Sequence, residues 1–240
     1  MVAESLRRDS LRTRASSVSD RTVLALVAAA IPVPLAIGLG VAYGQLAGLE
    51  ADQFGTVANN VSYGIASLAV VATVWGLLSE TERDAAFRFE RPGRAELGWT
   101  AVCFPVGVFL FVTATEIAAA FGAEMGGFGY TLEDPVTVAA VVFGGVLVAP
   151  FVEEVLFRGF LLGSLLGRGV SPVVAGVVTV VAFGAIHLPL LGVAGVFATT
   201  VWAILPTVLR LRFDNLSGAW LLHFVNNVWA NVGVVALGFA

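Results

Sequence analysis

Residues 135–167 read PVTVAAVVFGGVLVAPFVEEVLFRGFLLGSLLG, and only Glu153, Glu154 and Arg158 among them can carry a charge. About 20 apolar residues are enough for a helix to cross the ~30 Å hydrocarbon core of a bilayer. This stretch is longer than that, so we expect a membrane helix that is kinked at Pro150 or divided there into a spanning part and a membrane-edge part. The stretch therefore predicts a helical membrane protein.

Similar apolar runs recur along the rest of the chain. The sequence is 58% hydrophobic and 12% charged, whereas soluble domains carry roughly 25% charged residues. A water-facing surface cannot be built from so few charges. The predicted fold class is all-α, a polytopic transmembrane bundle of about seven helices in the cell membrane. The expected spans are 22–44, 61–79, 97–121, 135–167, 171–189, 191–210 and 216–239.

Arginine is the only basic residue besides histidine, and its placement predicts the orientation of the chain. With seven spans, twelve of the 13 arginines fall on one side of the membrane, which the positive-inside rule identifies as the cytoplasm. The N-terminus is then cytoplasmic. The arginines on that side are Arg7, Arg8, Arg12, Arg14, Arg21, Arg83, Arg88, Arg91, Arg94, Arg168, Arg210 and Arg212.

The same patterns divide the chain into three parts. Residues 1–21 are polar and are expected to be a disordered cytoplasmic tail, residues 22–134 to hold three transmembrane helices, and residues 135–240 to form a core of about four helices. The net charge of −4 gives no reason to expect nucleic acid as a partner. The lone Cys103 cannot form an internal disulfide. The partner that composition does imply is the lipid bilayer.

Apart from Arg210 at the cytoplasmic end of the sixth span, six Glu, Arg or His side chains fall inside the expected spans, where such groups are costly and usually mark a functional path. They are Glu116, Glu153, Glu154, Arg158, His187 and His223, which include both histidines of the chain. Glu154 and Arg158 are four residues apart and can pair on one helix face. Glu153 points about 100° away from Glu154 and can face another part of the bundle. Glu116 lies alone in the third span and receives no role.

Three motifs follow one another on successive expected helices of the second half. Residues 153–158 read EEVLFR, residues 183–187 read FGAIH, and residues 223–227 read HFVNN. These are the patterns EExxxR, FxxxH and HxxxN. At ~1.5 Å rise per residue, their polar residues come out at comparable depths in the membrane. They could therefore converge on one site.

In this order the motifs resemble those of the CPBP family, which comprises type II CAAX prenyl endopeptidases and bacteriocin-processing or self-immunity proteins. The resemblance covers about residues 135–235 and makes that part the expected catalytic core. It implies an intramembrane endopeptidase that hydrolyses a peptide bond with a glutamate-activated water. The implied substrate is a peptide or membrane protein, with or without a lipid group.

The resemblance also implies catalytic roles for four residues. Glu153 matches the general base, and His187 matches the residue that holds the water with it. His223 and Asn227 match the residues that stabilise the oxyanion, for which an imidazole N–H and an amide NH₂ are suitable donors. The plainer alternatives are a neutral structural acid at Glu153, a core histidine at His187, and interhelical hydrogen bonds from His223 and Asn227.

Three further residues are expected to support the site. An unpaired arginine in the bilayer would be costly, so Glu154 is expected to pair with Arg158 and to fix the helix that presents Glu153. Phe183 is expected to pack against His187 and set its rotamer.

No cofactor is firmly predicted. Zinc stays an open alternative, with Glu153, His187 and His223 as three protein ligands and water in the fourth position. That arrangement would make the protein a metalloendopeptidase. The chain has no HExxH motif, and the family's mechanism is usually described as glutamate-dependent, so we prefer metal-free chemistry.

Two other classes of function stay open. A non-catalytic immunity or scaffold protein could use the same fold, but it would have no need to keep all three motifs. A transporter with a proton-coupled acid often contains internal repeats, and the first three expected spans do not resemble the last four.

Overall fold

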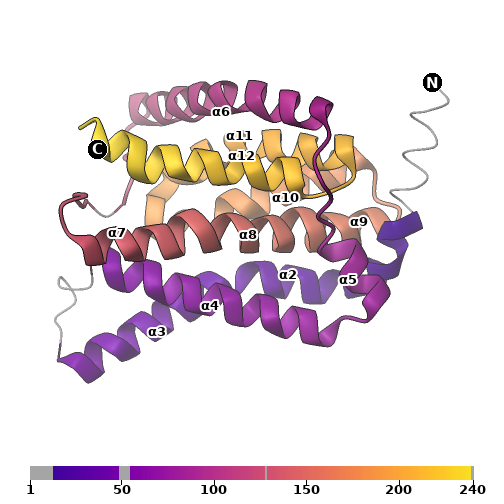
Figure 1. Ribbon diagram of the computed structural model, residues 1–240, viewed down its shortest axis with the longest axis horizontal. Helices are drawn as coiled ribbons and strands as arrows, with labels where there is room; N and C mark the ends of the chain where they lie inside the picture. Colours follow the sequence, from indigo (N-terminus) through magenta and orange to yellow (C-terminus); the bar gives the residue numbers. More distant parts are fainter. Residues whose placement is uncertain (1–12, 49–54, 128, 239–240) are drawn as a thin grey trace.

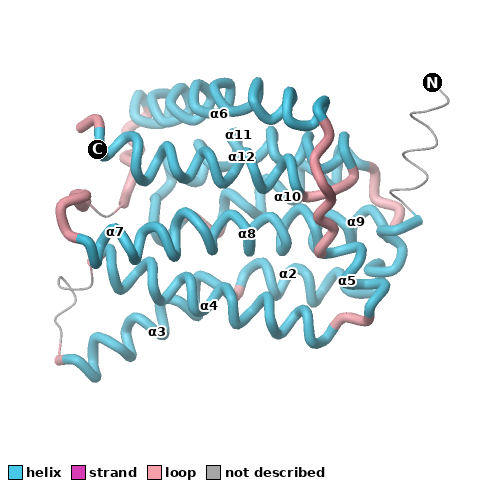
Figure 2. The backbone as a smooth tube through the Cα atoms, in the orientation of Figure 1, coloured by secondary structure: helices cyan, strands magenta, loops and turns pink. Residues whose placement is uncertain are grey.

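The computed structural model describes residues 13–48, 55–127 and 129–238. Within these ranges every regular element is a helix, as Figure 2 shows, which confirms the predicted all-α class. The elements are η1 (Ser16–Arg21), α2 (Thr22–Ala30), α3 (Pro32–Ala47), α4 (Thr56–Leu77), α5 (Glu80–Ala86), α6 (Arg94–Ala120), α7 (Pro135–Val141), η3 (Val142–Val148), α8 (Ala149–Glu153), η4 (Glu154–Leu161), α9 (Leu162–Gly167), α10 (Pro172–Ala185), α11 (Leu188–Phe213), α12 (Ser217–Val228), η5 (Trp229–Gly233) and α13 (Val234–Ala236).

The side chains are distributed as expected for a protein surrounded by lipid. Large apolar side chains point outward from several helices, including Phe109 at 68% exposure and Val173 at 76%. Glu154 and Arg158, in contrast, are fully buried. Five helical stretches in the described part of the chain are long and apolar enough to cross a membrane: 13–47, 56–77, 94–120, 135–167 and 188–213. The protein is a multi-pass membrane protein.

The two remaining expected spans differ from the prediction in length. The fifth, 171–189, is a shorter apolar helix, α10, which ends at Ala185. The seventh, 216–239, is helical over α12, η5 and α13. The boundary between the fifth and sixth spans falls in a turn at Ile186–His187 and at Gly192, whose φ of 65° interrupts α11. The count of seven spans and the cytoplasmic N-terminus stay predictions.

The helix that carries the EExxxR motif lies at the centre of the bundle. Elements α7 to α9 form one continuous helix over Pro135–Gly167, and Pro150 lies inside it without ending it. Figure 1 shows this helix running between α4 and α12, and both neighbours contact it. All eight residues of η4 are buried. Polar groups on this segment therefore have to find partners inside the protein.

Close backbone contacts hold the central helix against its neighbours. A Cβ atom at Gly159 of η4 would collide with the carbonyl oxygen of Ala86 at the end of α5, and one at Gly144 of η3 would collide with the backbone of Asn60 in α4. Small residues permit such approaches between membrane helices. The central helix thus approaches α4 most closely at Gly144 and α5 most closely at Gly159.

The described part of the expected tail is ordered rather than disordered. Residues 1–12 lie outside the described range, but 13–21 are helical and include η1. Val18 is fully buried, and Arg21 Nε donates to Glu82 Oε1 of α5 at 2.6 Å. The apolar contact and the ion pair explain why a segment of polar composition folds here.

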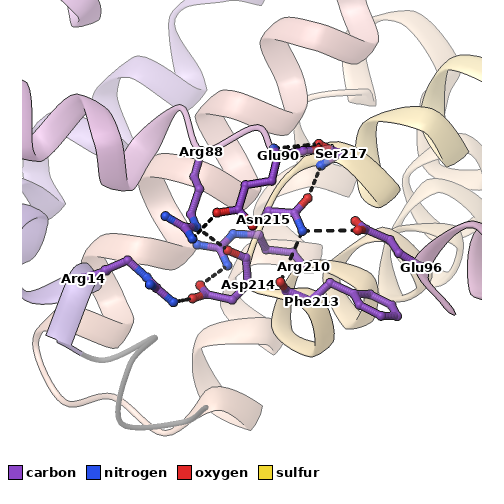
Figure 3. A network of polar contacts seen from close by, with 9 residues as sticks. All are labelled: Arg14, Arg88, Glu90, Glu96, Arg210, Phe213, Asp214, Asn215 and Ser217. Carbon is purple, nitrogen blue, oxygen red and sulfur yellow. Dashed lines mark hydrogen bonds and ion pairs between the residues drawn. The ribbon is translucent and has the colours of Figure 1, made fainter. Parts of the chain in front are cut away.

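Several arginine-bearing segments meet at one end of the bundle, which we call the arginine-rich end. Asp214, in the turn between α11 and α12, accepts hydrogen bonds from Arg210 at 2.9 Å and from Arg14, and Arg88 Nε donates to its backbone carbonyl at 2.9 Å (Figure 3). Asp214 has a φ of 56°, a conformation that aspartate tolerates better than most residues. The grouping agrees with the predicted clustering of arginines on one side.

The same end fixes the start of α12, the helix that carries His223. Glu96 of α6 is buried, and its Oε1 accepts the backbone N–H of Gly218 at 2.8 Å. Its Oε2 accepts from Asn215 Nδ2 at 3.3 Å, as Figure 3 shows. A carboxylate is favourable at a helix N-terminus because it satisfies unpaired N–H groups and faces the positive end of the dipole.

Candidate active site

Two π-helical segments flank the short helix α8, which ends at Glu153. Segment η3 precedes α8, and η4 begins at Glu154. Pro150 stands at the start of α8 and has no N–H to donate, so the wider turn of η3 lies where an α-helical hydrogen bond would be missing. Turns of this kind are frequent at functional sites. They set the direction in which the two adjacent glutamates point.

The expected ion pair between Glu154 and Arg158 is present and fully buried. Arg158 Nη1 donates to Glu154 Oε1 at 3.1 Å. The guanidinium also donates to Thr207 Oγ1 and to the carbonyl of Ala203, both at 3.3 Å, and its carbon lies 4.2 Å from the centre of the Phe183 ring. Such a set of acceptors, together with a π contact, is what an arginine needs when it is removed from water.

Glu153 lies beside Glu154 but has different partners. It is 5% exposed. Its Oε1 accepts a hydrogen bond of 2.6 Å from the hydroxyl of Tyr63 in α4, and its Oε2 lies 3.7 Å from Nε2 of His223. Helices α4, α8 and α12 thus meet at this one carboxylate.

His223 bridges the two glutamates. Its Nδ1 lies 2.8 Å from Glu154 Oε1, and its Nε2 faces Glu153. The Glu154 carboxylate only accepts when it is ionised, as its pairing with Arg158 requires, so the acceptor chemistry assigns a proton to Nδ1 of His223. The indole of Trp202 packs against the imidazole with ring centres 4.9 Å apart.

His187 lies in the turn between α10 and α11 and is partly buried. Its Nδ1 lies 2.8 Å from the carbonyl oxygen of Phe183. A carbonyl only accepts, so this contact assigns the proton to Nδ1 and leaves Nε2 of the neutral ring as an acceptor. No hydrogen bond joins His187 to Glu153 among the described contacts.

Phe183 occupies the middle of the cluster. Its ring centre lies 4.9 Å from that of His187 and 5.8 Å from that of His223. Both imidazoles therefore pack against one buried phenyl ring, together with the Arg158 guanidinium. The expected contact between Phe183 and His187 is present.

Asn227 faces the central helix one turn away from His223. Its Nδ2 donates to the carbonyl of Gly145 in η3 at 2.8 Å. Asn231 Nδ2 in turn donates to the backbone carbonyl of Asn227 at 2.9 Å. The hydroxyl of Tyr130 donates to the backbone carbonyl of Asn231 at 2.6 Å. An interhelical hydrogen bond, the plainer alternative for Asn227, is thus present. One N–H of the amide is engaged with Gly145, and an NH₂ group has a second.

The open zinc alternative can be compared with this geometry. Within the described ranges, no group of three His, Cys, Asp or Glu side chains is arranged to hold a metal ion. Glu153, His187 and His223, the donor set named for zinc, therefore do not form such a group in the described residues.

Sequence reasoning missed three neighbours of the cluster. Tyr63 comes from the first half of the chain, where no motif was found, and nothing in the pattern indicated it. Thr207 and the carbonyl of Ala203 flank Pro206 in α11. Pro206 leaves the carbonyl of Trp202, four residues earlier, without its helical partner, and not that of Ala203, so the sequence pattern did not indicate these two neighbours. Glu116, left without a role, is exposed on α6.

One protein-family model matches part of the chain. Residues 135–229 match the model described as Type II CAAX prenyl endopeptidase Rce1-like. Through this segment the chain is similar to the type II CAAX prenyl endopeptidases. The resemblance inferred from the three motifs is confirmed, and the matched segment contains Glu153, His187, His223 and Asn227.

The match covers less than half of the chain, from the start of α7 to the beginning of η5. Helices α2 to α6 lie outside it, although α4 contributes Tyr63 to the cluster. No curated protein and no solved structure matches the chain.

Proposed function

We propose that the protein is an intramembrane endopeptidase in which Glu153 activates the water that hydrolyses a peptide bond. The observation that carries this proposal is the 3.7 Å approach of Glu153 Oε2 to His223 Nε2 beside a fully buried ion pair. The match to the endopeptidase family model favours peptide hydrolysis over transport or a purely structural role.

The first step is attack of water on the peptide carbonyl. Glu153 Oε2 takes a proton from the water while the oxygen forms a bond to the carbonyl carbon. Nε2 of His187, free to accept, holds the second hydrogen of the same water. When the C–N bond breaks, protonated Glu153 returns its proton to the leaving amine, so that the carboxylate is regenerated.

The second requirement is stabilisation of the oxyanion that forms on the carbonyl oxygen. Since Nδ1 of His223 is bound to Glu154, its Nε2 donates only when the ring is an imidazolium. The second N–H of Asn227 is the other donor. Removal of one such donor typically lowers kcat by about 10²–10³-fold.

The substrate is a peptide or membrane protein that carries a long apolar group, either a lipid chain or apolar side chains. A cavity of about 380 Å³ lies next to the turn that holds His187, and Ile186, Pro189 and Phe157 line it together with residues of α2 and α3. Its volume is in the range of small-molecule sites, and its lining is almost wholly apolar. This lining supports an alkyl or isoprenyl group as the part of the substrate that binds there.

The proposal is tested with purified protein and a library of membrane-derived peptides, some of them prenylated. Glu153→Ala and His187→Ala are expected to abolish cleavage while the variants keep the thermal midpoint of the parent within a few degrees. A chelator arm measures metal dependence in the same assay. Full cleavage by folded Glu153→Ala would remove the assignment.

A non-catalytic immunity or scaffold role remains the alternative. The same variants distinguish the two, because a scaffold needs the fold and not the base. Full rescue of a deletion phenotype by Glu153→Ala would favour the scaffold.

A further inference from the structure

Tyr63 is a polar contact to the site from outside the family-matched segment. It belongs to α4, is partly buried, and donates to Glu153 Oε1 at 2.6 Å. Hydrogen bonds from a hydroxyl to a carboxylate are short and about twice as strong as those between neutral groups. The contact is thus among the strongest that Glu153 makes.

A glycine on each helix allows α4 to lie close to the central helix. Gly64, next to Tyr63, has no side chain, and the Phe143 ring occupies the space that a Cβ would take. Gly144 lies against the backbone of Asn60 in the same way. These two glycines bring α4 near enough for the Tyr63 hydroxyl to reach Glu153.

A single hydrogen bond on Oε1 has a consequence for Oε2. The terminal torsion of a glutamate is broad and not held by staggered wells, so the carboxylate needs an external contact to fix its plane. With Oε1 bound to Tyr63, Oε2 is the oxygen that faces His223 Nε2. The charged and titratable groups around the carboxylate are then Tyr63 from α4, His187 from the turn between α10 and α11, His223 from α12, and Glu154 and Arg158 from η4.

We infer that Tyr63 is a positioning residue, which fixes the Glu153 carboxylate so that Oε2 alone faces the water. This inference rests on the proposed function of Glu153. A tyrosine suits the task because its hydroxyl donates a hydrogen bond without adding a positive charge, so it orients the base and leaves the negative charge of the carboxylate in place. The first half of the chain therefore supplies part of the catalytic arrangement as well as membrane anchoring.

The test compares Tyr63→Phe with Tyr130→Phe. Both variants lose one hydroxyl that makes a 2.6 Å hydrogen bond, but Tyr130 donates to a backbone carbonyl and not to Glu153. Tyr63→Phe is expected to lower kcat by about 10- to 100-fold, as loss of a hydrogen bond to a charged group implies, with KM within twofold of the parent. Tyr130→Phe is expected to keep kcat within about twofold, since a neutral hydrogen bond contributes less.

A second comparison asks whether Tyr63 acts through Glu153. In a Glu153→Gln background, Tyr63→Phe is expected to leave the residual rate unchanged. A further tenfold loss in that background would overturn the inference, as would an unchanged kcat for Tyr63→Phe alone. The inference would also be overturned if Tyr63→Phe raised KM by the same factor as it lowered kcat and had a lower thermal midpoint than Tyr130→Phe. Such a result would indicate a general loss of structure. If Tyr63→Phe aggregates, Tyr63→Met, which also lacks the hydroxyl, takes its place.

The outcome is separable from that of the proposed function. Full cleavage by Glu153→Ala removes both the base and its positioning residue. An inactive Glu153→Ala beside a fully active Tyr63→Phe removes only the role of Tyr63.

Discussion

Nδ1 of His223 lies 2.8 Å from Oε1 of Glu154, the oxygen that also accepts from Arg158. The second glutamate of the motif thus links the buried arginine to the histidine. Pairing with Arg158 was expected from the spacing of four residues, but the contact with His223 joins helices 69 residues apart in sequence. Glu154 therefore has two partners whose loss can be separated by mutation.

Glu154→Gln is expected to destabilise the protein by about 3–5 kcal/mol, because it leaves the Arg158 charge buried without its partner. The double variant Glu154→Gln/Arg158→Met is expected to recover most of the thermal midpoint but not cleavage, since His223 still lacks its carboxylate. Thermal unfolding in detergent and peptide cleavage are measured on both. Recovery of activity together with stability would show that Glu154 serves Arg158 alone.

Gly159→Ala is expected to destabilise the protein by about 1–3 kcal/mol, the usual cost of overpacking, because the added methyl group meets the Ala86 carbonyl. Gly163→Ala, one turn further along the same helix, is the matched control. Its Cβ would lie 3.6 Å from Val18 Cγ2, an ordinary contact. Equal thermal midpoints for the two variants would contradict the packing of η4 on α5.

Asn227→Ala is expected to lower kcat by about 10²–10³-fold, as loss of an oxyanion donor does, with a smaller loss of stability from the broken bond to Gly145. Asn231→Ala is the control, since among the contacts of the described residues the Asn231 side chain donates to the backbone carbonyl of Asn227. The measurement is kcat for one fixed peptide. A fall in stability of Asn227→Ala with kcat unchanged would leave Asn227 as an interhelical contact.

The ion pair between Glu82 and Arg21 predicts how the stability of the protein changes at low pH. The hydrogen bond from Arg21, together with those from Ser79, lowers the pKa of Glu82 from 4.5 to about 2. A carboxyl with a lower pKa in the folded state contributes stability above the unfolded pKa and loses it as pH falls through the folded pKa. The thermal midpoint of the parent should therefore fall more between about pH 4.5 and about pH 2 than that of Glu82→Gln. Parallel curves for the two proteins would count against the ion pair.

The membrane fold and the polar cluster were accessible to sequence reasoning for different reasons. Apolar runs such as 135–167 exceed the thickness of a bilayer, so length alone predicts a span. Spacing of four residues is a local property of a helix, and the pair of Glu154 and Arg158 follows from it. Both predictions depend on neighbours within one helix.

What the sequence did not disclose depends on how helices pack. Tyr63 meets Glu153 only because Gly64 and Gly144 allow α4 to approach, and no periodicity encodes that contact. The wide turns of η3 and η4 rotate the side chains that follow them, so a regular 3.6-residue repeat could not give the direction of His223 toward Glu154. The ordered helix at 16–21 was missed because long-range contacts stabilise it, namely the burial of Val18 and the ion pair of Arg21 with Glu82.

The contact of Arg14 with Asp214 ties the start of the chain to the turn that leads into α12. Shortening the protein for expression beyond Thr13 would remove a cation from this turn, 200 residues away in sequence. The helix that presents His223 begins directly after it. Trimming the polar leader to improve yield is therefore not a neutral choice, and any shortened version should retain Arg14 if its activity is to be compared with that of the full chain.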